Sequence, residues 1–244
     1  MPSSSHRPRK RFGQHFLHDP RVLEKIIDAL NLQPADFVVE IGPGEGALTR
    51  LLLQRTSNVE TIEIDRDLAK RLVEEKIKVH QADALEFDYS VFPRGVRIVG
   101  NLPYNISTPL LFHLARYAER VRDMHFMLQL EVVERMVARH STPEYGRLSV
   151  ALQARFRMKK LFNVSKGAFR PPPKVESAVV RLEPLSEILP IDEDLLRRAF
   201  SARRKTLRNA LPGINFAALG IDAGLRPENL APEDYVRICA AAMS

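Results

Sequence analysis

The chain has 244 residues, of which 45% are hydrophobic and 27% are charged; this balance is typical of a globular protein and excludes a fibrous or largely disordered one. Its only cysteine, Cys239, excludes an internal disulfide framework and suits a reducing compartment. No apolar stretch reaches membrane-spanning length, and the first residues lack the apolar core of a secretory signal, so we expect a cytoplasmic protein without a membrane segment.

Short apolar runs alternate with amphipathic segments along most of the chain. Strands that alternate with helices at this spacing predict an α/β fold with a parallel, doubly wound sheet. Residues 148–156 fit either a helix or a strand. In chain order, the other predicted elements are helix 19–31, strand 37–41, helix 47–54, strand 59–64, helix 67–75, strand 77–80, strand 96–100, helix 108–117, strand 125–130, helix 132–139 and strand 175–182.

The last quarter of the chain has a different pattern. Residues 184–190 read as a linker, and only helical patterns follow it, at 194–202, 206–211, 216–219 and 232–242. We therefore predict three parts: a basic tail at 1–11, a catalytic domain at 12–185 and a small all-helical domain at 186–244.

Positive charge is concentrated at two places. Residues 1–11 hold four Lys or Arg and no acid, and a second group lies within the otherwise neutral region 186–244. With a net charge of +7, this pattern favours a polyanion such as RNA over a merely solvated charged face. The spacing of the second group places several members on one helical face. These RNA-binding candidates are Arg197, Arg198, Arg203, Arg204, Lys205 and Arg208.

Ligand-binding features follow the predicted strands at their carboxyl ends, where doubly wound sheets bind ligands. The turn Gly42–Gly46 lets a ligand approach the backbone, while Glu45 disfavours a phosphate there. Glu63 can bind both hydroxyls of a ribose, and Asp83 can accept from an adenine amino group. Each acid alone is as well explained as a surface or capping carboxylate. Together, these features describe a nucleoside without phosphates, such as S-adenosylmethionine.

The segment Asn101–Ser107 follows an apolar run and combines an amide, a fixed turn and an aromatic ring. Pro103 biases Leu102 toward an extended backbone, so the Leu102 carbonyl and the Asn101 side chain can both accept from an exocyclic amine while Tyr104 stacks on the ring. Two such acceptors and a ring above them would hold a nucleobase for chemistry at its amino nitrogen. The alternative is a simple strand-to-helix turn in which Ser107 caps the next helix.

Four motifs in this order resemble the class I methyltransferases and, more narrowly, the ribosomal RNA adenine dimethyltransferase family. They are VVEIGPGEGALT at 38–49, IEIDRDLA at 62–69, QADAL at 81–85 and NLPYNIS at 101–107. Segments 11–19, 145–149, 169–179 and 203–209 extend the resemblance over nearly the whole chain. It is strongest to the bacterial branch that dimethylates N6 of two adjacent adenosines near the 3′ end of 16S rRNA.

The resemblance implies a Rossmann-like sheet, S-adenosylmethionine as methyl donor, and a role in biogenesis of the small ribosomal subunit, performed by a monomer. Tyr104 and Phe169 would clamp the flipped adenine between their rings. The family usually has Asn where this chain has His15; a backbone contact survives that change, whereas a side-chain contact is altered. The implied cofactor residues are His15, Leu17, Gly42, Glu63, Asp83 and Asn101, and the implied catalytic residues are Asn101, Leu102, Pro103, Tyr104 and Phe169.

Other functions remain open at this point. A large-subunit rRNA adenine methyltransferase of the antibiotic-resistance type is disfavoured by the sequences at 101–107 and 203–209. A non-catalytic ribosome-assembly or transcription factor is disfavoured by the intact Asn101 and Tyr104, and a small-molecule methyltransferase by the basic clusters. No metal site is expected, because His15 and His18 have no third ligand nearby.

Overall fold

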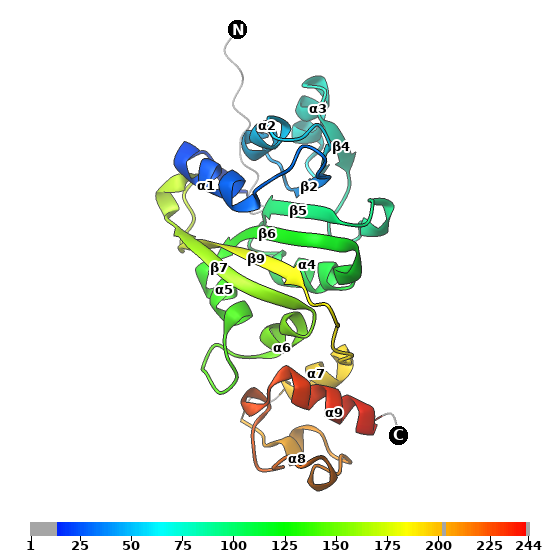
Figure 1. The fold of residues 1–244 in the computed structure, drawn as a ribbon. Coiled ribbons are helices and arrows are strands. Elements are labelled where there is room, and N and C mark those ends of the chain that lie inside the picture. The colour runs from blue at the N-terminus through cyan, green and yellow to red at the C-terminus, as the bar shows by residue number, and fades with distance from the viewer. Residues whose placement is uncertain (1–13, 202–203, 243–244) are drawn as a thin grey trace. The chain divides into compact units, whose positions relative to one another are not determined.

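A seven-stranded sheet dominates the computed structural model, which describes residues 14–201 and 204–242 (Figure 1). The strands lie in the order β4-β3-β2-β5-β6-β9-β7. Their bounds are β2 Val38–Ile41, β3 Val59–Glu63, β4 Lys78–Gln81, β5 Val96–Asn101, β6 Val121–Gln129, β7 Phe156–Val164 and β9 Ser177–Pro184. A separate two-stranded sheet pairs β1 (Phe16–Leu17) with β8 (Phe169–Arg170).

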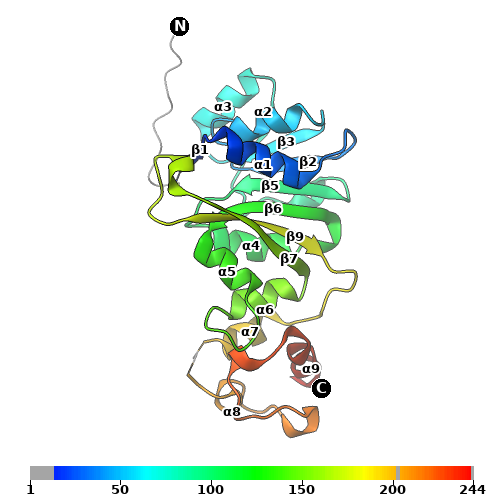
Figure 2. The same cartoon turned by 60° about the vertical axis from the view of Figure 1, so that its left-hand side comes forward.

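Helices cover both faces of the large sheet (Figures 1 and 2). Apolar residues of the first two helices share one core cluster with Val99, Met127 and Val179, which point from β5, β6 and β9 to the same face. Figures 1 and 2 show α4 on the opposite face. The helices of this part are α1 Pro20–Leu30, α2 Ala47–Leu53, α3 Arg66–Glu74, α4 Ser107–Ala115 and α5 Leu130–Val137.

The predicted order of strands and helices up to residue 139 is confirmed. Asp19 caps α1, as predicted, by accepting from the backbone N–H groups of Arg21 and Val22. Ser107 does not cap α4 with its side chain; it lies inside the helix, and its hydroxyl donates to the Tyr104 carbonyl oxygen. Residues 148–156 resolve mainly as a helix, α6 (Arg147–Gln153).

The sheet is mixed, although the alternating pattern predicts a wholly parallel one. Neighbours from β4 to β6 are parallel, and β9 pairs antiparallel with β6, with Met127 opposite Val179. Strand β7 was not predicted at all. Five of its nine residues are apolar, but the adjacent pair Lys159–Lys160 interrupts their alternation, and most of this edge strand is exposed or half-buried.

The described residues divide into two compact units, the first comprising 14–133 and 159–183 and the second 134–158 and 184–242. The second unit therefore includes residues 134–158, which lie N-terminal to the expected boundary at 185. Backbone hydrogen bonds from Ser141 to Glu228 and from Leu185 to Arg155 join its two stretches. Beyond α6, its α-helices are α7 Glu193–Ala199, α8 Leu207–Ala210 and α9 Pro232–Ala242.

Predicted helix 216–219 is a short 3₁₀ turn, Ala217–Leu219. Among residues 14–201 and 204–242, no helix combines the length and apolarity needed to span a membrane.

Candidate active site

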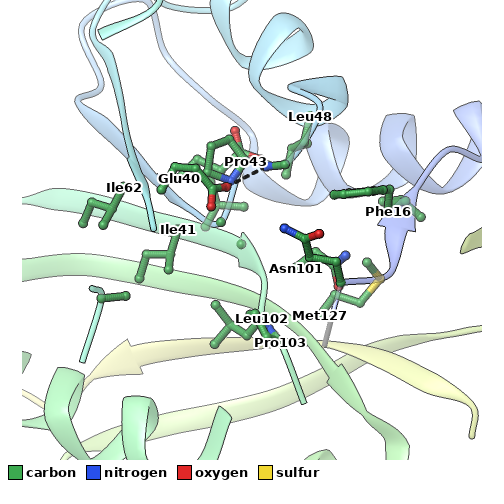
Figure 3. Close-up of a pocket in the computed structure, with 18 of the residues that line it drawn as sticks. Phe16, Glu40, Ile41, Pro43, Leu48, Ile62, Asn101, Leu102, Pro103 and Met127 are labelled. Atoms are coloured by element: carbon green, nitrogen blue, oxygen red, sulfur yellow. Dashed lines mark hydrogen bonds between the residues drawn. The ribbon is translucent and has the colours of Figure 1, made fainter. Parts of the chain in front are cut away.

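A cavity opens at the carboxyl ends of β2, β3 and β5, where the sequence places its ligand-binding features (Figure 3). All parts of this cavity belong to the first unit. The predicted residues that line it are His15, Leu17, Gly42, Glu63, Asp83, Asn101, Leu102, Pro103 and Tyr104.

The glycine turn between β2 and α2 forms one wall of the cavity. Gly42, Gly44 and Gly46 all have positive φ, which disfavours residues with a Cβ. A Cβ on Gly44 would lie 2.8 Å from Cδ1 of Phe16, so the Phe16 ring rests directly on the turn. In Figure 3, the Phe16 ring points toward the turn that contains Pro43. Phe16 was not predicted as a site residue, because nothing in its local pattern indicates such a distant neighbour.

Glu63 is held by the backbone on both sides of its carboxylate. Its Oε2 accepts from the Gly44 N–H at 3.2 Å, and its Oε1 accepts from the Asp65 N–H at 2.8 Å. Burial raises the pKa of this carboxyl, because the charged form is poorly solvated. Each oxygen retains a lone pair for a further donor, so the group can accept from two vicinal hydroxyls.

A second buried acid, Glu40, lies in the same cavity and was not predicted. It is the polar member of the apolar strand β2, and Thr49 Oγ1 donates to its Oε2 at 2.5 Å. Burial raises the pKa of Glu40 to about 7, and the neighbouring Glu63 adds to the shift. The signal that could have revealed it is an acid within an otherwise apolar run.

Asp83 lies at the loop after β4. Its Oδ1 accepts from the Leu85 N–H at 2.9 Å, an interaction that holds the carboxylate in a turn. Leu17 is buried on the other side of the cavity, and its strand β1 pairs with β8. The structure thus brings the predicted cofactor residues to one cavity.

The end of β5 supplies two hydrogen-bond acceptors. Asn101 Nδ2 donates to the His15 carbonyl oxygen at 2.8 Å, which identifies Oδ1 as the remaining acceptor of that amide. No described residue donates to this Oδ1 or to the Leu102 carbonyl oxygen. The Leu102 N–H is bonded to the Met127 carbonyl at 3.2 Å, which anchors the turn to β6.

His15 and Tyr104 face each other beside these acceptors. Their ring centroids are 5.6 Å apart at an interplanar angle of 30°. The Tyr104 hydroxyl lies 2.6 Å from Ser177 Oγ, and His15 Nδ1 lies 2.7 Å from the Pro171 carbonyl oxygen. Two hydrogen-bonding groups of His15 therefore serve the protein itself: its carbonyl oxygen holds Asn101, and its Nδ1 contacts Pro171.

Phe169 does not join this arrangement, contrary to the predicted clamp. It is 2% exposed and belongs to the core cluster, and it does not line the cavity. The physical reason is strand alternation: in β8, Phe169 packs toward the core opposite Leu17, and the next residue, Arg170, is exposed. The structure therefore shows one of the two predicted rings at the cavity.

The predicted RNA-binding residues lie in the second unit and are exposed where described. Arg197 and Arg198 are in α7, and Arg197 forms an ion pair with Asp194 at 2.9 Å. Arg204 and Lys205 precede α8 and lie outside both helices, so the cluster is divided between α7, α8 and the segment that joins them. Exposed Arg208 lies in α8, whereas Arg203, like the tail 1–11, is outside the described residues.

Comparisons with known proteins identify the family. The sequence profile described as "Ribosomal RNA adenine dimethylase" matches residues 5–242. The chain belongs to this family. A curated relative from Aromatoleum aromaticum, named "Ribosomal RNA small subunit methyltransferase A", is 57% identical, and the match covers 96% of this chain and 94% of the relative.

Solved structures agree with this assignment. A dimethyladenosine transferase from Plasmodium falciparum has a TM-score of 0.80 and 30% identity, covering 92% of this chain and 96% of that chain. The 23S rRNA methyltransferase ErmE has a TM-score of 0.70 and 27% identity, covering 94% and 100%. The fold is thus the Rossmann-like methyltransferase fold, and the chain is a member of an enzyme family.

Proposed function

We propose that the protein transfers methyl groups from S-adenosylmethionine to N6 of two adjacent adenosines near the 3′ end of 16S rRNA, forming N6,N6-dimethyladenosine during biogenesis of the small ribosomal subunit. The observation that carries this proposal is the pair of acceptors, Asn101 Oδ1 and the Leu102 carbonyl, in the same cavity as Glu63. The name of the relative that is 57% identical supports the small-subunit substrate.

The cavity fits S-adenosylmethionine, which when bound supplies an electrophilic methyl group. Glu63 would bind the ribose hydroxyls with the lone pairs left by Gly44 and Asp65. Asp83 would accept from the adenine amino group, while Leu17 and the backbone at Gly42 and His15 would pack against the nucleoside. The buried Glu40 suits the cationic part of such a molecule, because a nearby positive charge favours the ionised form of an acid.

Asn101 and Leu102 would activate the target adenine. The lone pair of its amino nitrogen is delocalised into the ring, so the nitrogen is a weak nucleophile. Accepting hydrogen bonds from both amino protons favours the pyramidal nitrogen and stabilises its developing positive charge. Asn101 Oδ1 is oriented for this role by the bond from Nδ2 to His15. Tyr104, held through Ser177, would stack on the adenine after it leaves its RNA stack, while Pro103 keeps the turn rigid.

The second methylation proceeds with fewer hydrogen bonds from the same nitrogen. After one methyl is added, the amine has one proton left to donate, so one of the two acceptors loses its partner. The first unit would perform both transfers, and Arg197, Arg198, Arg203, Arg204, Lys205 and Arg208 would bind rRNA. We propose that the enzyme acts as a monomer in the bacterial cytoplasm and requires no metal.

The decisive experiment is transfer of tritiated methyl groups to undermethylated small subunits, followed by nucleoside analysis. We expect the label in N6,N6-dimethyladenosine, and none when fully methylated small subunits are supplied. Large-subunit particles provide the control for the activity named in the ErmE structure, which is only 27% identical. Label confined to large subunits, or none with either particle, would overturn the proposal.

A further inference from the structure

The segment Arg170–Ser177, here called the rim loop, contacts the cavity residues at both of its ends. Near its start, the Pro171 carbonyl oxygen lies 2.7 Å from Nδ1 of His15, so this nitrogen carries the proton. At its end, Ser177 Oγ lies 2.6 Å from the Tyr104 hydroxyl. The loop therefore frames the pair of rings that stand beside the two acceptors of β5.

The start of the rim loop is fixed against the N-terminal strand. Arg170 is opposite Phe16 in the pairing of β8 with β1, and Phe16 lines the cavity. Figure 2 shows the yellow-green chain of this region beside β1. The position of Arg170 relative to the cavity is thus set by backbone hydrogen bonds.

Two cations of the rim loop are exposed and have no carboxylate partner among the described residues. They are Arg170 and Lys174. Elsewhere in the first unit, cations such as Arg97 and Arg181 form ion pairs. The loop has one acid, Glu176. Its backbone carbonyl oxygen accepts from the Leu130 N–H. Val175, 42% exposed, adds an apolar surface between the charges.

When the base of a nucleotide enters the cavity, its sugar and phosphates stay outside, at the mouth of the cavity. The phosphates on either side of the flipped residue then lie outside the cavity, next to whatever frames it. Unpaired Arg and Lys side chains are the groups that bind such phosphates, with gain from released counterions.

We propose that Arg170 and Lys174 bind the phosphate backbone of the RNA strand that carries the target adenosine, at the mouth of the cavity. This inference rests on the proposed function and adds a second RNA contact, in the first unit, to the basic cluster of the second unit. The rim loop thereby links strand binding to the ring pair: the same segment that holds phosphates touches His15 and Tyr104.

The test compares the double variant Arg170→Gln/Lys174→Gln with wild type on undermethylated small subunits. We expect about tenfold weaker binding of the particle, and a plot of log affinity against log salt that is flatter by about 1.4, since each phosphate contact on a single strand contributes about 0.7. Affinity for S-adenosylmethionine, measured by calorimetry on the free enzyme, should stay within twofold of wild type.

Two further variants make the result specific. Arg170→Lys/Lys174→Arg keeps both charges and should restore particle binding. The matched control Lys76→Gln/Arg94→Gln removes one exposed Lys after α3 and one exposed Arg before β5, neither with a carboxylate partner among the described residues. This control should keep the wild-type affinity and salt slope.

The outcomes separate this inference from the proposed function. If wild type transfers no methyl to the particles, the proposed function fails. If wild type is active and the rim-loop double variant keeps its affinity and salt slope, the proposed function stands and the rim-loop inference is overturned. Loss of S-adenosylmethionine binding in that variant would also overturn it, because the two side chains would then act on the cavity.

Discussion

The two sides of the cavity are built in different ways. On the cofactor side, the glycine turn, Glu63 and Asp83 lie at the ends of consecutive parallel strands, and backbone N–H groups hold the two carboxylates. On the base side, Asn101 and Tyr104 are held by His15 and Ser177, which are 86 and 73 residues away in sequence. The first side is organised locally by β-α turns, whereas the second depends on contacts between remote segments.

This difference predicts that substitutions on the two sides separate cofactor binding from methyl transfer. The largest effect is expected for Asn101→Ala. Removing one of two acceptors that stabilise developing charge should lower kcat by about 10²–10³-fold. Affinity for S-adenosylmethionine should fall by less, about tenfold at most, because Glu63 and Asp83 remain.

Asn105→Ala is the matched control, because Asn105 lines the same cavity and its side chain makes no hydrogen bond to the described residues. Single-turnover transfer and calorimetry measure the two quantities. A wild-type kcat for Asn101→Ala would show that methyl transfer does not depend on the Asn101 amide.

The second expectation concerns pH and the buried acid Glu40. Its folded pKa of about 7 lies above the unfolded value near 4.5, so the folded state binds more protons between these values. Stability should therefore fall as pH rises from 4.5 to 7, by about 3 kcal/mol at most. Glu40→Gln keeps an acceptor for Thr49 and should remove this loss.

Urea unfolding of wild type and Glu40→Gln at pH 5 and pH 8 measures the effect. His125 contributes with the opposite sign: burial lowers its pKa to about 4, so its neutral form favours folding as pH rises toward 6.5. Subtracting the free energy of unfolding of wild type from that of the variant at each pH removes the contribution of His125, which the two proteins share. Parallel pH profiles for the two proteins would contradict the assignment of the buried proton to Glu40.

Glu63→Gln should have an intermediate effect on cofactor binding. The new amide must place its NH2 against the N–H of either Gly44 or Asp65, so one of the two backbone bonds is lost. We expect S-adenosylmethionine to bind about 30-fold more weakly, with kcat at saturation within about threefold of wild type. Glu45→Gln, at an exposed position, is the control for the loss of one negative charge. An unchanged dissociation constant for S-adenosylmethionine in Glu63→Gln would contradict the expected difference between the two sides.

The smallest effect is expected outside the cavity. Charge reversal by Arg204→Glu/Lys205→Glu should weaken particle binding by about tenfold and flatten its salt dependence, while affinity for S-adenosylmethionine is unchanged. Filter binding at several salt concentrations measures this. A salt slope equal to that of wild type would assign these exposed side chains to a solvated face.

The success of prediction from the sequence also differs between the cofactor side and the base side. The cofactor side was predicted, since its residues come at strand ends and parallel strands end at one edge. Phe16 was missed because its contact with the turn at Gly44 depends on how the N-terminal segment packs. The Phe169 ring was expected at the cavity but is buried in the core, because the motif does not say which face of β8 points inward; its role toward the adenine stays a prediction. Strand β7 was not predicted, because the adjacent pair Lys159–Lys160 interrupts the alternation of its apolar residues.

By itself, the sequence determined the order of strands and helices, the edge of the sheet where the ligand groups meet, and the chemistry those groups offer. Local patterns suffice for this, because backbone geometry and apolar period decide which segments become strands. Only the tertiary structure decided which groups are free to act. Asn101 Oδ1 is an available acceptor because the distant His15 carbonyl takes the amide N–H. The Phe169 ring lies in the core and not in the cavity lining, because its burial there stabilises the fold.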